Sequence, residues 1–116
     1  MESLDLANEI TEIIVDKMGE DTLILDLHEV TTFADYFVIS TMTSRRQLDA
    51  VQSAIRSGLK QGAEYVLPKN IEGEPNSGWV LLDYNSVIVH LFTADTRAYY
   101  NLEELWKNGR VVTRIQ

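Results

Sequence analysis

Apolar residues recur every three or four positions in two stretches of the chain, the spacing that places them on one side of an α-helix. The first stretch predicts a helix from about Ser3 to Met18, closed by Gly19. Its acidic side chains would face solvent, and its apolar face would contain Leu6, Ile10, Ile13, Ile14 and Met18.

The second stretch predicts a helix from Arg45 to about Gln61, with Gly62 as its stop. Ser44 followed three residues later by Gln47 matches a capping box at its start. The face toward the core would carry Leu48, Val51, Ile55 and Leu59. A third helical region is predicted from about Ala94 to Lys107, with a break near Asn101.

Short runs rich in β-branched and aromatic residues predict strands at Thr22–Leu27, Tyr36–Thr41 and Tyr65–Leu67, the last ended by Pro68. The stretch KNIEGEPNSG is rich in Gly, Pro and Asn and predicts a loop. The tail GRVVTRIQ fits either a short strand or a loose end. Helices alternate with strands, so residues 1–116 predict a single α/β domain with a mixed five-stranded sheet and flanking helices.

The stretch WVLLDYNSVIVHLF, Trp79 to Phe92, reads as two apolar strands joined by a two-residue turn at Asn85-Ser86. In that register Leu81 lies opposite His90. Side chains alternate between the faces of a sheet. One face would then carry Val80, Leu82, Tyr84, Val87, Val89 and Leu91, and the other Trp79, Leu81, Asp83, Ile88, His90 and Phe92.

The first of these faces suits packing against a helix, whereas the second mixes aromatic rings with an acid and an imidazole. An unpaired buried Asp83 would cost several kcal/mol. The second face is therefore either left open, as in a protein-binding surface anchored by Trp79, or covered by polar partners within the fold. In the covered case Trp79 closes an edge of the core and His90 bonds to a backbone group.

Charge is unevenly distributed along the chain, whose net charge is −8. Ten acids and one base precede Arg45, and eight acids and nine bases follow from there. Such a chain is a poor general binder of nucleic acid, because affinity for phosphates comes from Lys and Arg. The acidity fits either a basic protein partner or solubility alone.

The sequence argues against a disulfide scaffold, a structural metal site, a membrane span and a signal peptide. The chain has no cysteine and only two histidines, so neither a disulfide scaffold nor a structural metal is expected. No apolar run approaches the roughly 20 residues of a membrane span, and the acidic start does not resemble a signal peptide. We expect a soluble, cytoplasmic protein without membrane contact.

Catalytic motifs are absent from the sequence. There is no dinucleotide fingerprint, and Gly73 and Gly78 have P-loop spacing but are followed by Trp-Val in place of Lys-Ser/Thr. A triad of Ser40, His90 and Asp83 lacks a nucleophile elbow, and no strand pairs two carboxylates. We expect no enzyme activity and no cofactor.

Four segments resemble the ribosomal silencing factors, also called Iojap-related proteins. They are ADYFVIS, TSRRQ, EGEPNSGWVLLDYNSVIVHLF and TRAYYNLEELW, which occur in the family's order and spacing. The resemblance as a whole covers nearly the entire chain, from about Leu6 to Trp106. One departure is Met42, which stands where many members have glycine.

The resemblance implies a non-enzymatic factor that binds the large ribosomal subunit through its protein number fourteen. There it would block association with the small subunit and repress translation under nutrient limitation. The family's fold looks like that of nucleotidyltransferases without their catalytic residues, and members often form homodimers. We therefore also expect a weak homodimer, favoured by unpaired strand edges.

Carried over onto this chain, the family's motifs select a set of partner-binding residues. The resemblance tips the interpretation toward an open face, with Trp79 and Leu81 as anchors and Asp83 as an acid meeting a basic protein. The full set is Glu72, Gly73, Trp79, Leu81, Asp83, His90 and Tyr100.

Two alternatives remain open. Fold analogy alone suggests a nucleotide-binding or nucleotidyltransferase enzyme. A direct RNA binder would use Arg45, Arg46, Arg56 and Lys60, although we expect no binding of free RNA near physiological salt.

Overall fold

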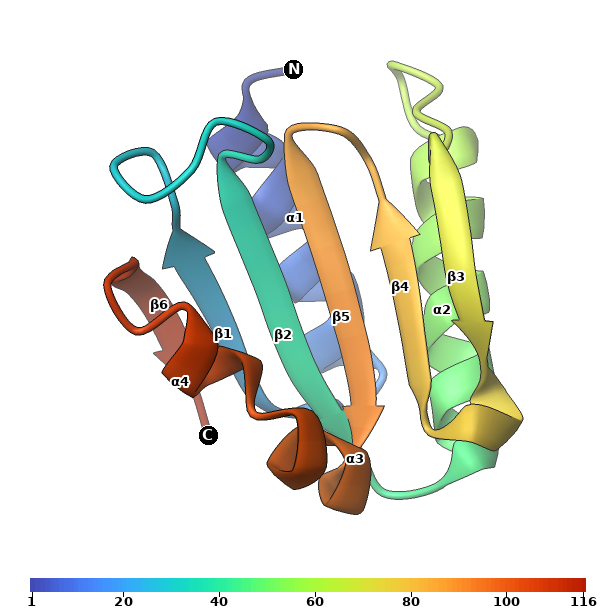
Figure 1. Cartoon of the computed structure of the whole chain (residues 1–116). Coiled ribbons are helices and arrows are strands. Elements are labelled where there is room, and N and C mark those ends of the chain that lie inside the picture. The colour runs from blue at the N-terminus through green and yellow to red at the C-terminus, as the bar shows by residue number, and fades with distance from the viewer.

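A computed structural model describes all residues, 1–116, as one α/β domain (Figure 1). The predicted helices and most predicted strands are present. Four α-helices, six strands and one 3₁₀ turn follow one another as α1 (Ser3–Asp16), β1 (Glu20–Asp26), β2 (Tyr36–Met42), α2 (Arg45–Lys60), β3 (Asn70–Glu74), η1 (Pro75–Ser77), β4 (Trp79–Asp83), β5 (Val87–Thr93), α3 (Ala94–Tyr100), α4 (Leu102–Leu105) and β6 (Arg110–Ile115).

The strands form one mixed sheet in the order β3-β4-β5-β2-β1-β6. Only β2 and β5 run parallel, and every other neighbouring pair is antiparallel. The predicted mixed sheet is confirmed, but the predicted number of five strands is wrong because the sheet has six. The nucleotidyltransferase likeness stays a prediction.

Two segments between α2 and β4 differ from the sequence prediction. Tyr65–Leu67 is not a strand, because the Val66 N–H donates to Leu59 O and holds this segment against the end of α2. The predicted loop instead contains β3, which pairs along β4. Asn, Glu and Gly are poor strand formers, so the local composition predicted a loop. The segment is nevertheless extended because it pairs with β4. The tail forms the sixth strand, paired with β1.

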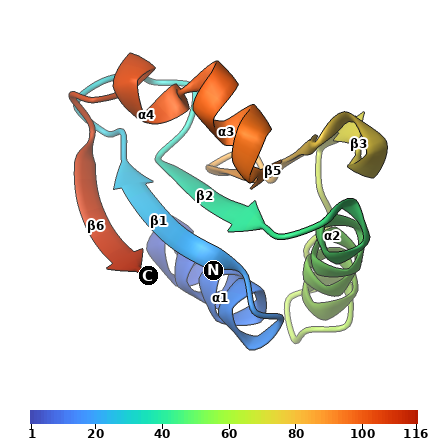
Figure 2. The same ribbon diagram turned by 90° about the horizontal axis from the view of Figure 1, so that it is seen from below.

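Helices α1 and α2 cover one face of the sheet, here called the helix face (Figure 2). Most of their predicted apolar positions are buried there, including Ile10 and Ile55, and Ile13 is half-buried. Met18 is an exception at 76% exposure, because α1 ends at Asp16. Ser44 caps α2 as predicted, but Gln47 uses its side-chain oxygen to bond the Thr43 N–H.

The opposite face, here called the outer face, is covered only in part. The third helical region breaks as predicted at Asn101, whose left-handed φ of 48° separates α3 from α4. Leu102 and Trp106 pack on the outer side of β1, β2 and β5, whereas no helix lies in front of β3 and β4 (Figure 1). None of the helices has both the length and the apolar character required to span a lipid bilayer.

Candidate functional site

The outer face of β3, β4 and β5 brings five of the seven predicted partner-binding residues together, whereas Gly73 lies on β3 opposite Val80 of the helix face and Tyr100 belongs to α3. The hairpin register is as predicted, with Leu81 opposite His90. The neighbouring strand β3 extends each row outward, with Glu72 opposite Leu81. Three rows result, namely Glu74–Trp79–Phe92, Glu72–Leu81–His90 and Asn70–Asp83–Ile88.

Exposure falls along each row from the sheet edge inward. Residues of β3 are exposed, the outer-face residues of β4 are half-buried, and those of β5 are buried. The prediction of an open face is therefore wrong for β5, where His90 is 4% exposed and Phe92 is 0% exposed. The cause is tertiary: α3 packs against β5, the Phe37 ring of the neighbouring strand β2 contacts the His90 ring, and Trp106 packs on Phe37.

Trp79 lies at the boundary between the covered and the open part of the outer face. Its ring stacks on Phe92 with centroids 5.3 Å apart, and Tyr100 from α3 lies 4.5 Å away on a tilted plane. Tyr100 itself is 47% exposed. Trp79 is thus both a closing residue of the core edge and part of the accessible surface, which combines the two readings of the sequence.

The buried side chain of His90 fixes the orientation of the Trp79 ring through a hydrogen bond. The Trp79 Nε1–H donates to His90 Nδ1 at 3.3 Å, and because an indole nitrogen only donates, Nδ1 must be unprotonated. His90 Nε2 has no hydrogen-bond partner. Burial lowers the pKa of His90 to about 3, so the imidazole is neutral at pH 7. His90 therefore positions Trp79 and does not itself reach solvent.

The Glu72-Gly73 pair shapes the sheet edge. Glu72 points to the outer face and accepts a hydrogen bond from Asn70 Nδ2 at 2.8 Å. Gly73 has φ of 79°, and a Cβ at this position would collide with the carbonyl oxygen of Trp79. Only glycine allows β3 to approach β4 this closely with that backbone conformation. Gly73 contributes through its backbone rather than as a contact side chain.

Asp83 has a role within the fold. One carboxylate oxygen accepts the Asn85 N–H at 2.7 Å and thereby holds the hairpin turn, where Asn85 has a left-handed φ of 74°. The side chain remains half-exposed at the edge of the outer face. Asp83 is therefore neither buried without a partner nor wholly committed to the core.

The accessible residues of this region combine acids with apolar groups. We call the set the acidic–apolar patch, and it consists of Glu72, Glu74, Trp79, Leu81, Asp83 and Tyr100. No base from these three strands faces it. Half-buried aromatic and aliphatic anchors with charges at the rim are the usual arrangement of a protein-binding surface.

The sequence model of the protein family described as "Ribosomal silencing factor during starvation" matches residues 1–116. The chain belongs to this family.

Individual relatives agree with the family match. The chain is 41% identical over 91 residues to the ribosomal silencing factor RsfS of Bacillus subtilis, which covers 78% of this chain and 75% of that protein. It is 34% identical over 113 residues to the protein of the same name from Halalkalibacterium halodurans, covering 97% and 94%. A crystal structure of a protein from Chromobacterium violaceum superimposes with a TM-score of 0.86 at 28% identity, covering 100% and 94%.

Within this member of the silencing factor family, Arg97 organises the helices beside the patch. It is 8% exposed and donates to Asp21 O at 2.7 Å and to Thr41 Oγ1 at 2.8 Å. Its Nε also pairs with Glu103 at 2.9 Å. These contacts tie α3 and α4 to β1 and β2, and so hold Tyr100 over Trp79. Sequence reasoning missed this role, since only the spacing of Arg97 and Glu103 within TRAYYNLEELW hinted at it.

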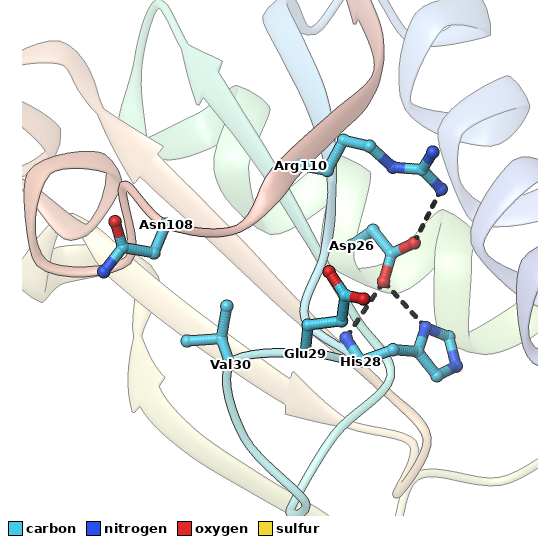
Figure 3. A pocket seen from close by; sticks show the side chains of 6 residues that line it. All are labelled: Asp26, His28, Glu29, Val30, Asn108 and Arg110. Carbon is cyan, nitrogen blue, oxygen red and sulfur yellow. Dashed lines mark hydrogen bonds and ion pairs between the residues drawn. The ribbon is translucent and has the colours of Figure 1, made fainter.

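A separate hollow of about 300 Å³ lies at the far end of β1, lined by Asp26, His28, Glu29, Val30, Asn108 and Arg110 (Figure 3). Asp26 accepts the backbone N–H of His28 at 2.9 Å and contacts His28 Nδ1 at 2.7 Å and Arg110 Nη2 at 3.1 Å. The backbone N–H is the main reason that the pKa of Asp26 falls to about 2. The Asp26 carboxylate in turn raises the pKa of His28. This cluster fastens β6 to the segment after β1.

Proposed function

We propose that the acidic–apolar patch docks on a basic protein of the large ribosomal subunit, its protein number fourteen. Occupation of that protein would block association with the small subunit and repress translation when nutrients are short. The main observation in support is that the accessible part of the outer face combines aromatic and aliphatic side chains with three acids, in a chain that belongs to the ribosomal silencing factor family.

The chemistry of the patch supports this choice of partner. Trp79 offers apolar area that is already ordered by Phe92 and Tyr100, so little of its side-chain entropy is lost on binding, and Leu81 adds apolar area beside it. Glu72, Glu74 and Asp83 surround them and would attract Lys and Arg of a basic protein. Of the residues selected from the sequence, Gly73 and His90 act through Glu72 and Trp79 rather than by direct contact.

We further propose that this role is non-enzymatic, needs no cofactor, and is carried out in the cytoplasm with the ribosome. The nucleotidyltransferase-like fold would then be a scaffold without that chemistry. Calorimetry with ATP and magnesium tests this point directly. Binding in the micromolar range would contradict a purely non-enzymatic account.

The main test is cosedimentation with purified large subunits, with and without added small subunits. The chain should travel with the large subunit and should reduce the fraction of joined ribosomes. Failure to bind the large subunit would overturn the proposal.

Glu72→Lys identifies the surface, because Glu72 is exposed and its replacement leaves the core untouched. We expect roughly tenfold weaker binding to the subunit and to isolated protein fourteen, with a loss that diminishes at high salt. Glu12→Lys, at an exposed position of α1, makes the same change of charge elsewhere and should bind as the unmodified chain does. Equal binding by the two variants would remove the patch as the docking site.

A further inference from the structure

The solvent side of α2 carries a basic stripe, defined here as Arg46, Ser53, Arg56, Ser57 and Lys60. At the helical rotation per residue these positions fall within about 100° of arc, and all five are exposed. Helix α2 contains four bases and one acid, Asp49, whereas the rest of the chain has a net charge of −11. Positive charge is therefore concentrated on this one helix.

The bases of the stripe form no ion pair with a carboxylate, which is also true of Arg45, Lys17 and Lys69 but not of the other bases. Arg97, Lys107, Arg110 and Arg114 each lie within 3.2 Å of an acidic side chain. Arg56 approaches only the Gln52 amide oxygen, at 3.5 Å, and Lys60 forms no ion pair. In so acidic a chain, cations left unpaired on one face remain available for an external anion.

The arrangement of donors suits phosphate. Two cations and two hydroxyl groups, those of Arg56, Lys60, Ser53 and Ser57, line a surface hollow of about 310 Å³ together with Leu67 and Pro68. No carboxylate lines this hollow. Guanidinium, ammonium and hydroxyl groups are the side chains that donate to phosphate oxygens.

The stripe and the acidic–apolar patch flank the same edge of the sheet. Helix α2 lies behind β3 and β4 in Figure 1, whereas the strand register places the patch on the opposite, outer face of these strands. At the start of α2 a second hollow joins Arg45 and Arg46 directly to Glu74 of the patch. A large partner that covers the edge strand β3 would therefore lie close to both surfaces.

We infer that the basic stripe binds RNA phosphates of the ribosomal subunit when the acidic–apolar patch is docked on its protein partner, an inference that rests on the proposed function. The dense negative charge of a ribosomal subunit is that of its RNA, which favours RNA over an acidic protein as the occupant. Three unpaired bases hold free RNA too weakly against the remaining charge of the chain. Docking through the patch raises the effective concentration of phosphate at the stripe and makes the second contact effective.

The test compares Arg56→Gln/Lys60→Gln with Lys17→Gln/Lys107→Gln, a control pair that removes the same charge from exposed positions outside the stripe. Binding is measured to whole large subunits over a range of salt concentrations, and to isolated protein fourteen without RNA. Thermal melting confirms that both variants are folded. We expect the stripe variant to bind subunits roughly three- to tenfold more weakly than the control, with a salt dependence lower by about one to two phosphate contacts. Its binding to isolated protein fourteen should be unchanged.

The outcomes separate the two proposals. If the unmodified chain does not bind subunits, both the proposed function and the inference fail. If the chain binds and the two variants bind subunits equally, only the inference fails. If the stripe variant loses affinity equally for isolated protein fourteen, the stripe contacts protein and the assignment to RNA is overturned.

Discussion

The Trp79 indole donates its only hydrogen bond to His90 Nδ1, 3.3 Å away across the β4–β5 hairpin. The acceptor is a buried imidazole whose other nitrogen is unpartnered. The ring that anchors the accessible patch is thus fixed in orientation by a residue that solvent does not reach. Stability and surface shape are coupled at this pair, and the first two predictions test that coupling.

Replacement of Trp79 by alanine should destabilise the fold by about 3 kcal/mol. The change removes the stacking on Phe92 and Tyr100 and leaves His90 without any hydrogen bond. Trp79→Phe loses the same hydrogen bond to His90 but keeps an aromatic ring, and should cost less, about 1–2 kcal/mol. Urea unfolding measures both. A loss below about 0.5 kcal/mol for Trp79→Ala would show that the ring is a surface group only.

His90 should remain neutral throughout the ordinary pH range. Its pKa of about 3 in the folded chain lies below the unfolded value of 6.5. Its contribution to stability is therefore complete above pH 6.5 and is lost as the pH falls toward 3. Imidazole NMR signals of His90 should not shift between pH 8 and pH 5, with His28→Gln used to assign them. A midpoint near pH 6 would contradict the buried, hydrogen-bonded geometry.

His28 should titrate in the opposite sense. The Asp26 carboxylate raises its pKa above 6.5, so its contribution to stability is present below pH 6.5 and is lost as the pH rises through the folded pKa. Asp26→Asn removes the hydrogen-bonded charge and should return the NMR midpoint of His28 toward 6.5. An unchanged midpoint in that variant would mean that the Asp26–His28 contact does not persist in solution.

Arg97 should contribute far more to stability than Arg114, although both pair with Asp21. The Arg97 side chain is 9% exposed, and Arg97→Met would leave Glu103 and its other partners unsatisfied at a cost of about 3–5 kcal/mol. The Arg114 side chain is 43% exposed, so Arg114→Met should cost less than about 1 kcal/mol. Urea unfolding measures the free energy of unfolding of both variants. Similar losses of stability in the two variants would refute the assigned role of Arg97.

We propose that the weak homodimer expected from the sequence forms through β6. This edge strand exposes Val111, Val112 and Ile115, whereas the other edge, β3, carries acids that would repel their copies. Val112→Lys should weaken self-association seen by light scattering at several hundred micromolar. Leu105→Lys, which changes an exposed apolar residue on α4, serves as the control. A strictly monomeric unmodified chain at that concentration would contradict the prediction.

Local patterns were sufficient for most of the fold. The periodic apolar residues of α1 and α2 predicted two helices and the faces that they bury, and Ser44 predicted where α2 begins. The register of the β4–β5 hairpin also followed, because a two-residue turn leaves a single pairing of Leu81 with His90. These features depend on residues close together in the chain.

The sequence predicted which face of the hairpin the candidate residues occupy but not how exposed they are. Alternation correctly placed Trp79, Leu81, Asp83 and His90 on one face of the hairpin. It could not show that α3, Phe37 and Trp106 would bury His90 and leave β4 only half-covered. Which side of a strand a residue occupies is local information, whereas what lies over that side is not.

The α/β class, the helix faces, the hairpin register and the family motifs could be inferred from local sequence, because each is encoded within a window of a few residues. Three further features depend on packing between distant segments: Asn70–Glu74 is a strand, Arg97 joins α3 and α4 to the sheet, and the unpaired bases of α2 flank the same edge as the acids of the patch. These relationships join residues far apart in the chain. Their free energy comes from strand pairing, burial and charge contacts that exist only once the distant segments have packed together.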